Sequence, residues 1–199
     1  RDYNYTSAVI DAKAAADYLA GLETVDGGNL GVMGWSQGGT DALLAAEAHP
    51  GTFQAVVTWS GALELNGASL FAGTSFEDAY AQAKKEGFYT MTFDWREPLE
   101  LGERWFQEVA ETNILKVTAD IKAPILAING KDDTTVTPDN AEKIVKAAAN
   151  ADSQLLLVDN CDHTYNVFSG DFTALYQTVD ATAAFFQAQL IPAAAQAAA

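Results

Sequence analysis

The chain has 199 residues, of which 49% are hydrophobic and 19% charged, so it suits one globular domain with a sizeable core rather than a disordered chain. Its 11 Lys+Arg against 27 Asp+Glu give a net charge of −16, which excludes nucleic acid and anionic membrane surfaces as favoured partners. One cysteine and two histidines exclude an internal disulfide and a multi-cysteine or histidine-rich metal site, so we expect no metal.

Helical and strand patterns alternate along most of the chain. Apolar residues recur at helical spacing over residues 8–20, 40–48, 138–149 and 171–190, and short apolar runs predict buried strands at 30–33, 53–59, 124–129 and 154–158. No apolar run approaches the roughly 18 residues of a transmembrane helix, so we expect no membrane insertion. The alternation predicts an α/β fold with a mostly parallel sheet covered by helices on both faces.

Residues 61–119 interrupt this alternation. They contain nine of the chain's 21 Phe, Tyr and Trp residues. We interpret them as a mostly helical cap inserted between two strands, with residues 1–60 and 120–191 forming the core and 192–199 a low-complexity tail. The aromatic side chains of the cap could pack its own small core, line a substrate pocket, or do both.

The sequence Gly-Trp-Ser-Gln-Gly-Gly at residues 34–39 lies between a predicted strand and a predicted helix. A serine on so sharp a turn is forced toward strained backbone angles, with its hydroxyl exposed at the end of the strand. We expect Gly34 and Gly38 to be glycine because side chains there would collide with the neighbouring strand and helix. Ser36 is therefore a candidate nucleophile.

A serine hydroxyl needs a base, and only two histidines are available. His49 precedes Pro50 at the end of a predicted helix, where we expect it to act as a helix cap. His163 follows the predicted strand at 154–158, and sites assemble in loops at the carboxyl ends of parallel strands. We therefore expect His163 to be the base.

The histidine in turn needs a carboxylate that orients it. Asp132 and Asp133 both follow the predicted strand at 124–129, and either could serve. We favour Asp133, with Asp132 shaping the turn. The resulting order of nucleophile, acid and histidine is that of hydrolases with a strand–serine–helix turn.

These motifs resemble those of the serine α/β-hydrolases: Gly-Val-Met-Gly-Trp-Ser-Gln-Gly-Gly at 31–39, Gly-Lys-Asp-Asp at 130–133 and Asp-His-Thr-Tyr-Asn at 162–166. The cap is similar in length and position to that of bacterial feruloyl (cinnamoyl) esterases. The resemblance implies Ser36 as nucleophile, Asp133 as acid, His163 as base and the backbone N–H of Gln37 as an oxyanion donor. It also implies a small-molecule ester as substrate and no cofactor.

Two other functions remain open at this point. The Gly-Trp-Ser-x-Gly-Gly pattern also resembles prolyl-oligopeptidase-type peptidases. A non-catalytic binding module of hydrolase descent is the third alternative, although it would have no reason to retain all of Ser36, Asp133 and His163.

The chain departs from the hydrolase pattern before Ser36. Hydrolases of this kind usually take a second oxyanion donor from a His-Gly-type loop after an early strand, and this sequence contains no such loop. It therefore resembles the C-terminal two-thirds of the α/β-hydrolase fold. We expect a second polypeptide or an N-terminal segment to complete the fold.

Overall fold

A computed structural model of the chain describes residues 1–67, 70–71, 73–92 and 97–191. At its centre is a parallel sheet of four strands in the order β1-β2-β5-β6. The strands are β1 (Leu30–Trp35), β2 (Phe53–Trp59), β5 (Ile125–Gly130) and β6 (Gln154–Val158). Parallel neighbours need long crossover connections, and helices supply them here.

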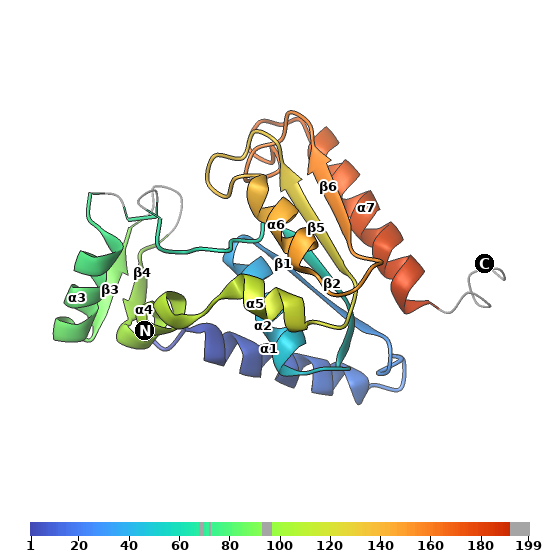
Figure 1. The fold of residues 1–199 in the computed structure, drawn as a ribbon, viewed down its shortest axis with the longest axis horizontal. Helices are drawn as coiled ribbons and strands as arrows, with labels where there is room; N and C mark the ends of the chain where they lie inside the picture. The colour runs from blue at the N-terminus through green and yellow to red at the C-terminus, as the bar shows by residue number, and fades with distance from the viewer. Residues whose placement is uncertain (68–69, 72, 93–96, 192–199) are drawn as a thin grey trace.

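Helices cover both faces of this sheet, as the alternating pattern predicts (Figure 1). On one face α7 (Thr173–Leu190) packs Phe185 into an apolar cluster of β2, β5 and β6 side chains. On the other face lie α2 (Gln37–Ala48) and α6 (Asp139–Ala147), and α1 (Tyr5–Ala20) packs against α2. No helix within the described ranges is both long and apolar enough to cross a membrane.

The predicted buried strand at 30–33 exists, but the prediction that it is buried is wrong for one of its faces. Along β1, exposed and half-buried residues alternate, and Met33 and Trp35 are 46% and 42% exposed. Met33 and Trp35 are exposed because β1 lies at one edge of the described sheet. Helix α7 approaches this face of β1 near Gly31. A Cβ atom at Gly31 would lie 2.5 Å from the Phe186 ring.

The insertion between β2 and β5 contains three helices, but they cover fewer than half of its described residues, and it also contains an antiparallel strand pair that the sequence analysis missed. Its elements are α3 (Phe76–Glu86), β3 (Phe88–Met91), β4 (Leu99–Gly102), α4 (Glu103–Glu111) and α5 (Ile114–Asp120). Gly87, with φ +87°, ends α3 and turns the chain directly into β3. Figure 1 shows α3, β3 and β4 projecting away from the four-stranded sheet.

The aromatic residues of the insertion pack against one another. Phe71, Phe76, Trp105 and Phe106 are buried, and the Trp105 and Phe106 ring centroids lie 4.9 Å apart. Tyr80 stacks on Phe106 at 5.5 Å. Two further aromatic residues of the predicted cap, Phe93 and Trp95, lie outside the described residues, as does the predicted tail at 192–199. The first of the two interpretations therefore describes these side chains: they form the core of the insertion.

An acidic side chain sits at the junction of α1 and α2 without full hydrogen bonding. The hydroxyl of Tyr3 donates to Oδ2 of Asp41 at 2.5 Å, whereas the buried Oδ1 has no partner among the described residues. Burial raises the pKa of Asp41 to about 6, although the Tyr3 hydrogen bond acts in the opposite direction. In the unfolded chain the same carboxyl ionises near pH 4.

Replacing Asp41 with asparagine is expected to stabilise the protein above pH 6. Because the pKa of Asp41 is higher in the folded than in the unfolded protein, the folded state holds this proton more tightly. The stability that the protonated carboxyl contributes is complete below about pH 4 and is lost as the pH rises through 6. The asparagine oxygen still accepts from Tyr3, and the gain is on the order of 1–2 kcal/mol. Thermal melts of both proteins at pH 5 and pH 8 measure it. Asp11→Asn, an exposed change on α1, is the control, and an Asp41→Asn gain that is the same at both pH values would contradict the argument.

Candidate active site

Ser36 occupies a strained turn where β1 ends and α2 begins. Its φ of 56° and ψ of −123° lie in a region that residues other than glycine rarely adopt, as predicted. Backbone hydrogen bonds fix the turn, since the Ser36 N–H donates to the Trp59 carbonyl at 2.8 Å and the Ala62 N–H donates to the Ser36 carbonyl at 3.3 Å. The hydroxyl is thereby held at the carboxyl end of the sheet.

The predicted need for glycine holds at one of the two expected positions. A Cβ at Gly34 would lie 1.9 Å from the Gly38 carbonyl oxygen, a distance that no side chain tolerates. At Gly38 itself a Cβ meets nothing within 4 Å, so that prediction is wrong. The tight position is instead Gly39, where a Cβ would approach the Gly61 Cα to 2.8 Å. Residue 39 faces the loop after β2, whereas residue 38 faces open space.

Asp133 lies in the loop after β5 with its side chain fully buried. Its Oδ1 accepts hydrogen bonds from the backbone N–H groups of Thr135 and Val136, at 2.9 and 2.8 Å. Burial would raise the pKa of this carboxyl, but hydrogen bonds from His163, the Val136 backbone and Ser60 outweigh it and hold the pKa below its usual value. The carboxylate is therefore ionised at neutral pH.

His163 lies in the loop after β6, which is folded around Asp162. Oδ1 of Asp162 accepts from the N–H groups of Thr164 and Asn166, at 2.8 and 2.9 Å. The indole N–H of Trp35 donates to the His163 carbonyl at 2.9 Å, and the two rings lie 5.2 Å apart between centroids. The imidazole is thus held from its own loop and from the end of β1.

The three predicted side chains form one hydrogen-bonded line. Nε2 of His163 lies 3.1 Å from the Ser36 Oγ, and Nδ1 lies 2.8 Å from Oδ2 of Asp133. An ionised carboxylate can only accept, so the proton of the neutral imidazole is on Nδ1. Nε2 then carries a lone pair directed at the serine hydroxyl and can take its proton.

Residues that the sequence analysis missed surround this line. Ser60, which is fully buried with φ 47°, directly follows β2. Its hydroxyl lies 3.2 Å from the hydroxyl of Tyr165, two residues after His163. The Nδ2 atom of Asn129 donates to the Val136 carbonyl at 2.9 Å and lies 3.4 Å from Oδ2 of Asp133. Their position in the sequence could have indicated them, because Ser60 and Asn129 lie at the carboxyl ends of predicted strands, as Ser36 and Asp133 do.

The other candidates from the sequence lie elsewhere. His49 is the C-cap residue of α2, as predicted, at the opposite end of a 12-residue helix from Ser36. Asp132 is exposed, and its backbone N–H donates to the Cys161 carbonyl, so it shapes the turn. Burial, with nearby aspartates, raises the pKa of the Cys161 thiol to about 11, which keeps it a neutral thiol.

The candidate oxyanion donor is the backbone N–H of Gln37. It belongs to the first residue of α2, and the first N–H groups of a helix have no partner within it. The helix dipole adds positive potential at the same place. The expected second donor and the segment that would supply it stay predictions.

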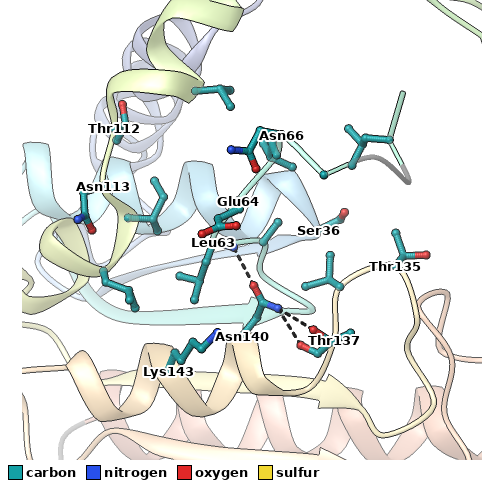
Figure 2. Close-up of a pocket in the computed structure, with 18 of the residues that line it drawn as sticks. Ser36, Leu63, Glu64, Asn66, Thr112, Asn113, Thr135, Thr137, Asn140 and Lys143 are labelled. Atoms are coloured by element: carbon teal, nitrogen blue, oxygen red, sulfur yellow. Dashed lines mark hydrogen bonds between the residues drawn. The ribbon is translucent and has the colours of Figure 1, made fainter. Parts of the chain in front are cut away.

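A pocket of about 640 Å³ opens beside Ser36 (Figure 2). Its walls come from the loop after β2, the junction of α4 and α5, and the segment from the loop after β5 into α6. Apolar lining residues include Leu63, Leu65, Leu70, Ile114 and Val136. Asparagine and threonine residues supply most of the polar lining. No described aromatic side chain lines this pocket, so the alternative in which the cap aromatics form the substrate wall fails for the described residues.

Comparisons with known proteins agree on the fold. The sequence model of the prolyl oligopeptidase family matches residues 4–191. Est1E from Butyrivibrio proteoclasticus is 18% identical, with a TM-score of 0.71 over 96% of this chain and 72% of that one. A monoacylglycerol lipase from Paleococcus ferrophilus is 16% identical, with a TM-score of 0.73 over 94% of this chain and 76% of that one.

A puromycin-hydrolysing peptidase from Mycobacterium tuberculosis is 23% identical, with a TM-score of 0.64 over 92% of this chain and 25% of that one. No match was found among curated proteins. At these identities the solved structures show a shared fold alone.

Proposed function

The chain belongs to the prolyl oligopeptidase family of serine α/β-hydrolases, and from this premise we propose that it hydrolyses carboxylic esters of small molecules. The observation that carries the proposal is the line from Ser36 through His163 to Asp133, with separations of 3.1 and 2.8 Å. A buried carboxylate, an imidazole that it orients and a serine hydroxyl within reach of that imidazole are the three side-chain groups that triad acyl transfer uses.

The proposed reaction has two steps. The Ser36 Oγ attacks the ester carbonyl carbon while Nε2 of His163 takes the hydroxyl proton, and the same nitrogen then protonates the departing alcohol. Water, deprotonated by His163, then attacks the acyl-enzyme carbonyl carbon, and the bond to the Ser36 Oγ breaks as His163 returns the proton to that oxygen, which releases the acid. Asp133 keeps the proton on Nδ1 and stabilises the imidazolium that forms in each step. The Gln37 N–H donates to the oxyanion.

Esters are proposed over amides because the proteins that share this fold include a monoacylglycerol lipase and Est1E, which has been solved with ferulic acid bound. Feruloyl-type and short-chain acyl esters are the first candidates. The match to a peptidase family favours a second candidate, the hydrolysis of short peptide amides. A pocket of about 640 Å³ is in the range of small-molecule sites and holds an acyl group larger than acetyl.

A fluorophosphonate probe and a substrate panel test the proposal. The probe should add its mass to the peptide that contains Ser36 and to no other. Methyl ferulate and nitrophenyl esters of short acids should turn over faster than dipeptide anilides, which would dominate if the peptidase reading holds. Absence of labelling in the folded protein would contradict the proposal and favour the non-catalytic binding module.

A further inference from the structure

The pocket beside Ser36 carries more negative than positive charge. Its lining contains three carboxylates, those of Glu64, Glu111 and Asp139, and one cation, Lys143. The Lys143 ammonium donates to Oδ2 of Asp139 at 2.6 Å, so this pair is neutral. Glu64 and Glu111 remain, and they leave the pocket with an excess of two negative charges.

Of these two carboxylates, Glu64 is the one without a hydrogen-bond donor. Glu111 accepts from Nε2 of Gln107, one turn earlier on α4, at 3.2 Å. No described residue donates a hydrogen bond to the Glu64 side chain. Its influence reaches Lys143, whose pKa is raised chiefly by Asp139 and additionally by the Glu64 charge. That lysine is already bound to Asp139, so it does not neutralise Glu64.

The backbone on which Glu64 stands is tied to the nucleophile turn. The Ala62 carbonyl accepts from the Thr40 hydroxyl at 2.5 Å, and the Ala62 N–H donates to the Ser36 carbonyl. The Leu63 N–H donates to Oδ1 of Asn140 at 3.1 Å. Figure 2 shows Glu64 among the lining side chains, on the same loop as Leu63 and Asn66. The backbone that carries Glu64 is therefore held against the Ser36 turn, and the exposed Glu64 carboxylate lies in the same pocket lining as Ser36.

We propose that Glu64 makes this pocket select a substrate group with a positive charge, in preference to a neutral group of the same shape and most strongly over a carboxylate. The inference rests on the proposed function, since it assigns a substrate class to the same site. A cationic group on the substrate would give the Glu64 carboxylate the oppositely charged partner that it lacks. A carboxylate would instead meet Glu64, Glu111 and the field of a chain with net charge −16.

Three nitrophenyl esters test this, with a trimethylammonium group, a tert-butyl group or a carboxylate at the end of the same three-carbon acyl chain. Three acetate thioesters carry the same groups on the thiol leaving group, because the pocket could hold either the acyl side or the leaving-group side of the substrate. In at least one of the two series, kcat/KM of the wild type, divided by the hydroxide-catalysed rate constant of the same compound, should be about fivefold higher for the trimethylammonium compound than for the tert-butyl compound. The carboxylate should react most slowly. A cation-to-neutral ratio near one in both series overturns the proposal.

Two variants separate the effect of the Glu64 carboxylate from the effect of the protein's overall negative charge. Glu64→Gln keeps the shape and is expected to bring the ratio to about one. Glu103→Gln makes the same change in net charge on α4, outside the pocket lining, and should leave the ratio as in the wild type. Equal loss of the ratio in both variants would assign the preference to the general field and overturn the role of Glu64.

Binding without turnover distinguishes this proposal from the proposed function. Ser36→Ala lacks the nucleophile, so calorimetry can measure its affinity for the intact esters. If the wild type hydrolyses no ester while Ser36→Ala binds the cationic ester more tightly than the neutral one, the proposed function fails and the selectivity stands. If the wild type hydrolyses the neutral ester and neither measurement shows a charge preference, only the selectivity fails.

Discussion

Replacing Ser36 with alanine is expected to lower kcat for the best ester by about a millionfold. The acyl-enzyme can no longer form, and the remaining groups of a serine hydrolase act only as a unit. The fold should persist, because the strained turn is held by backbone hydrogen bonds, from the Ser36 N–H to the Trp59 carbonyl and from the Ala62 N–H to the Ser36 carbonyl, rather than by the hydroxyl. Alanine at position 36, where φ is 56°, lacks only the hydroxyl and leaves these backbone hydrogen bonds in place.

Initial rates and a thermal melt of the same samples measure both parts of this expectation. Ser169→Ala, in the exposed loop before α7, serves as the matched serine-to-alanine control and should keep activity. A Ser36→Ala protein that is folded, pure and still active within tenfold of the wild type would show that another group is the nucleophile.

Replacing Asp133 with asparagine is expected to lower kcat about ten-thousandfold. Two backbone N–H groups, of Thr135 and Val136, point at the position of Oδ1, so the asparagine oxygen must take that place. The amide NH₂ then faces Nδ1 of His163 and donates to it. The imidazole proton moves to Nε2, which can no longer accept the Ser36 hydroxyl proton.

Asp132→Asn is the matched control, since it makes the same change one residue away on an exposed side chain. It should alter kcat by no more than about twofold. Single-turnover measurements of acylation and deacylation should show both steps slowed in Asp133→Asn. If the two variants lost activity equally, the loss would belong to the loop as a whole and not to the carboxylate that faces the imidazole.

Much of the site was accessible from the sequence because the chain offers few alternatives. Only two histidines exist, and the one at a helix end was separated from the one after a strand by local pattern alone. The glycine-rich turn at 34–39 was recognisable because strand, turn and helix follow each other without a gap. Strands at 53–59 and 154–158 were predicted at the bounds that the structure has, since short apolar runs between polar turns leave little freedom.

The sequence by itself therefore determined the α/β alternation, the strained turn at Ser36 and the histidine that meets it, since these depend on local pattern and residue scarcity. Only the tertiary structure decided which of two adjacent aspartates faces His163, because burial of Asp133 and exposure of Asp132 arise from the path of the loop. It also placed the cap aromatics in their own core and left Glu64 in the pocket wall. Those outcomes depend on contacts between segments far apart in the chain, which no local pattern contains.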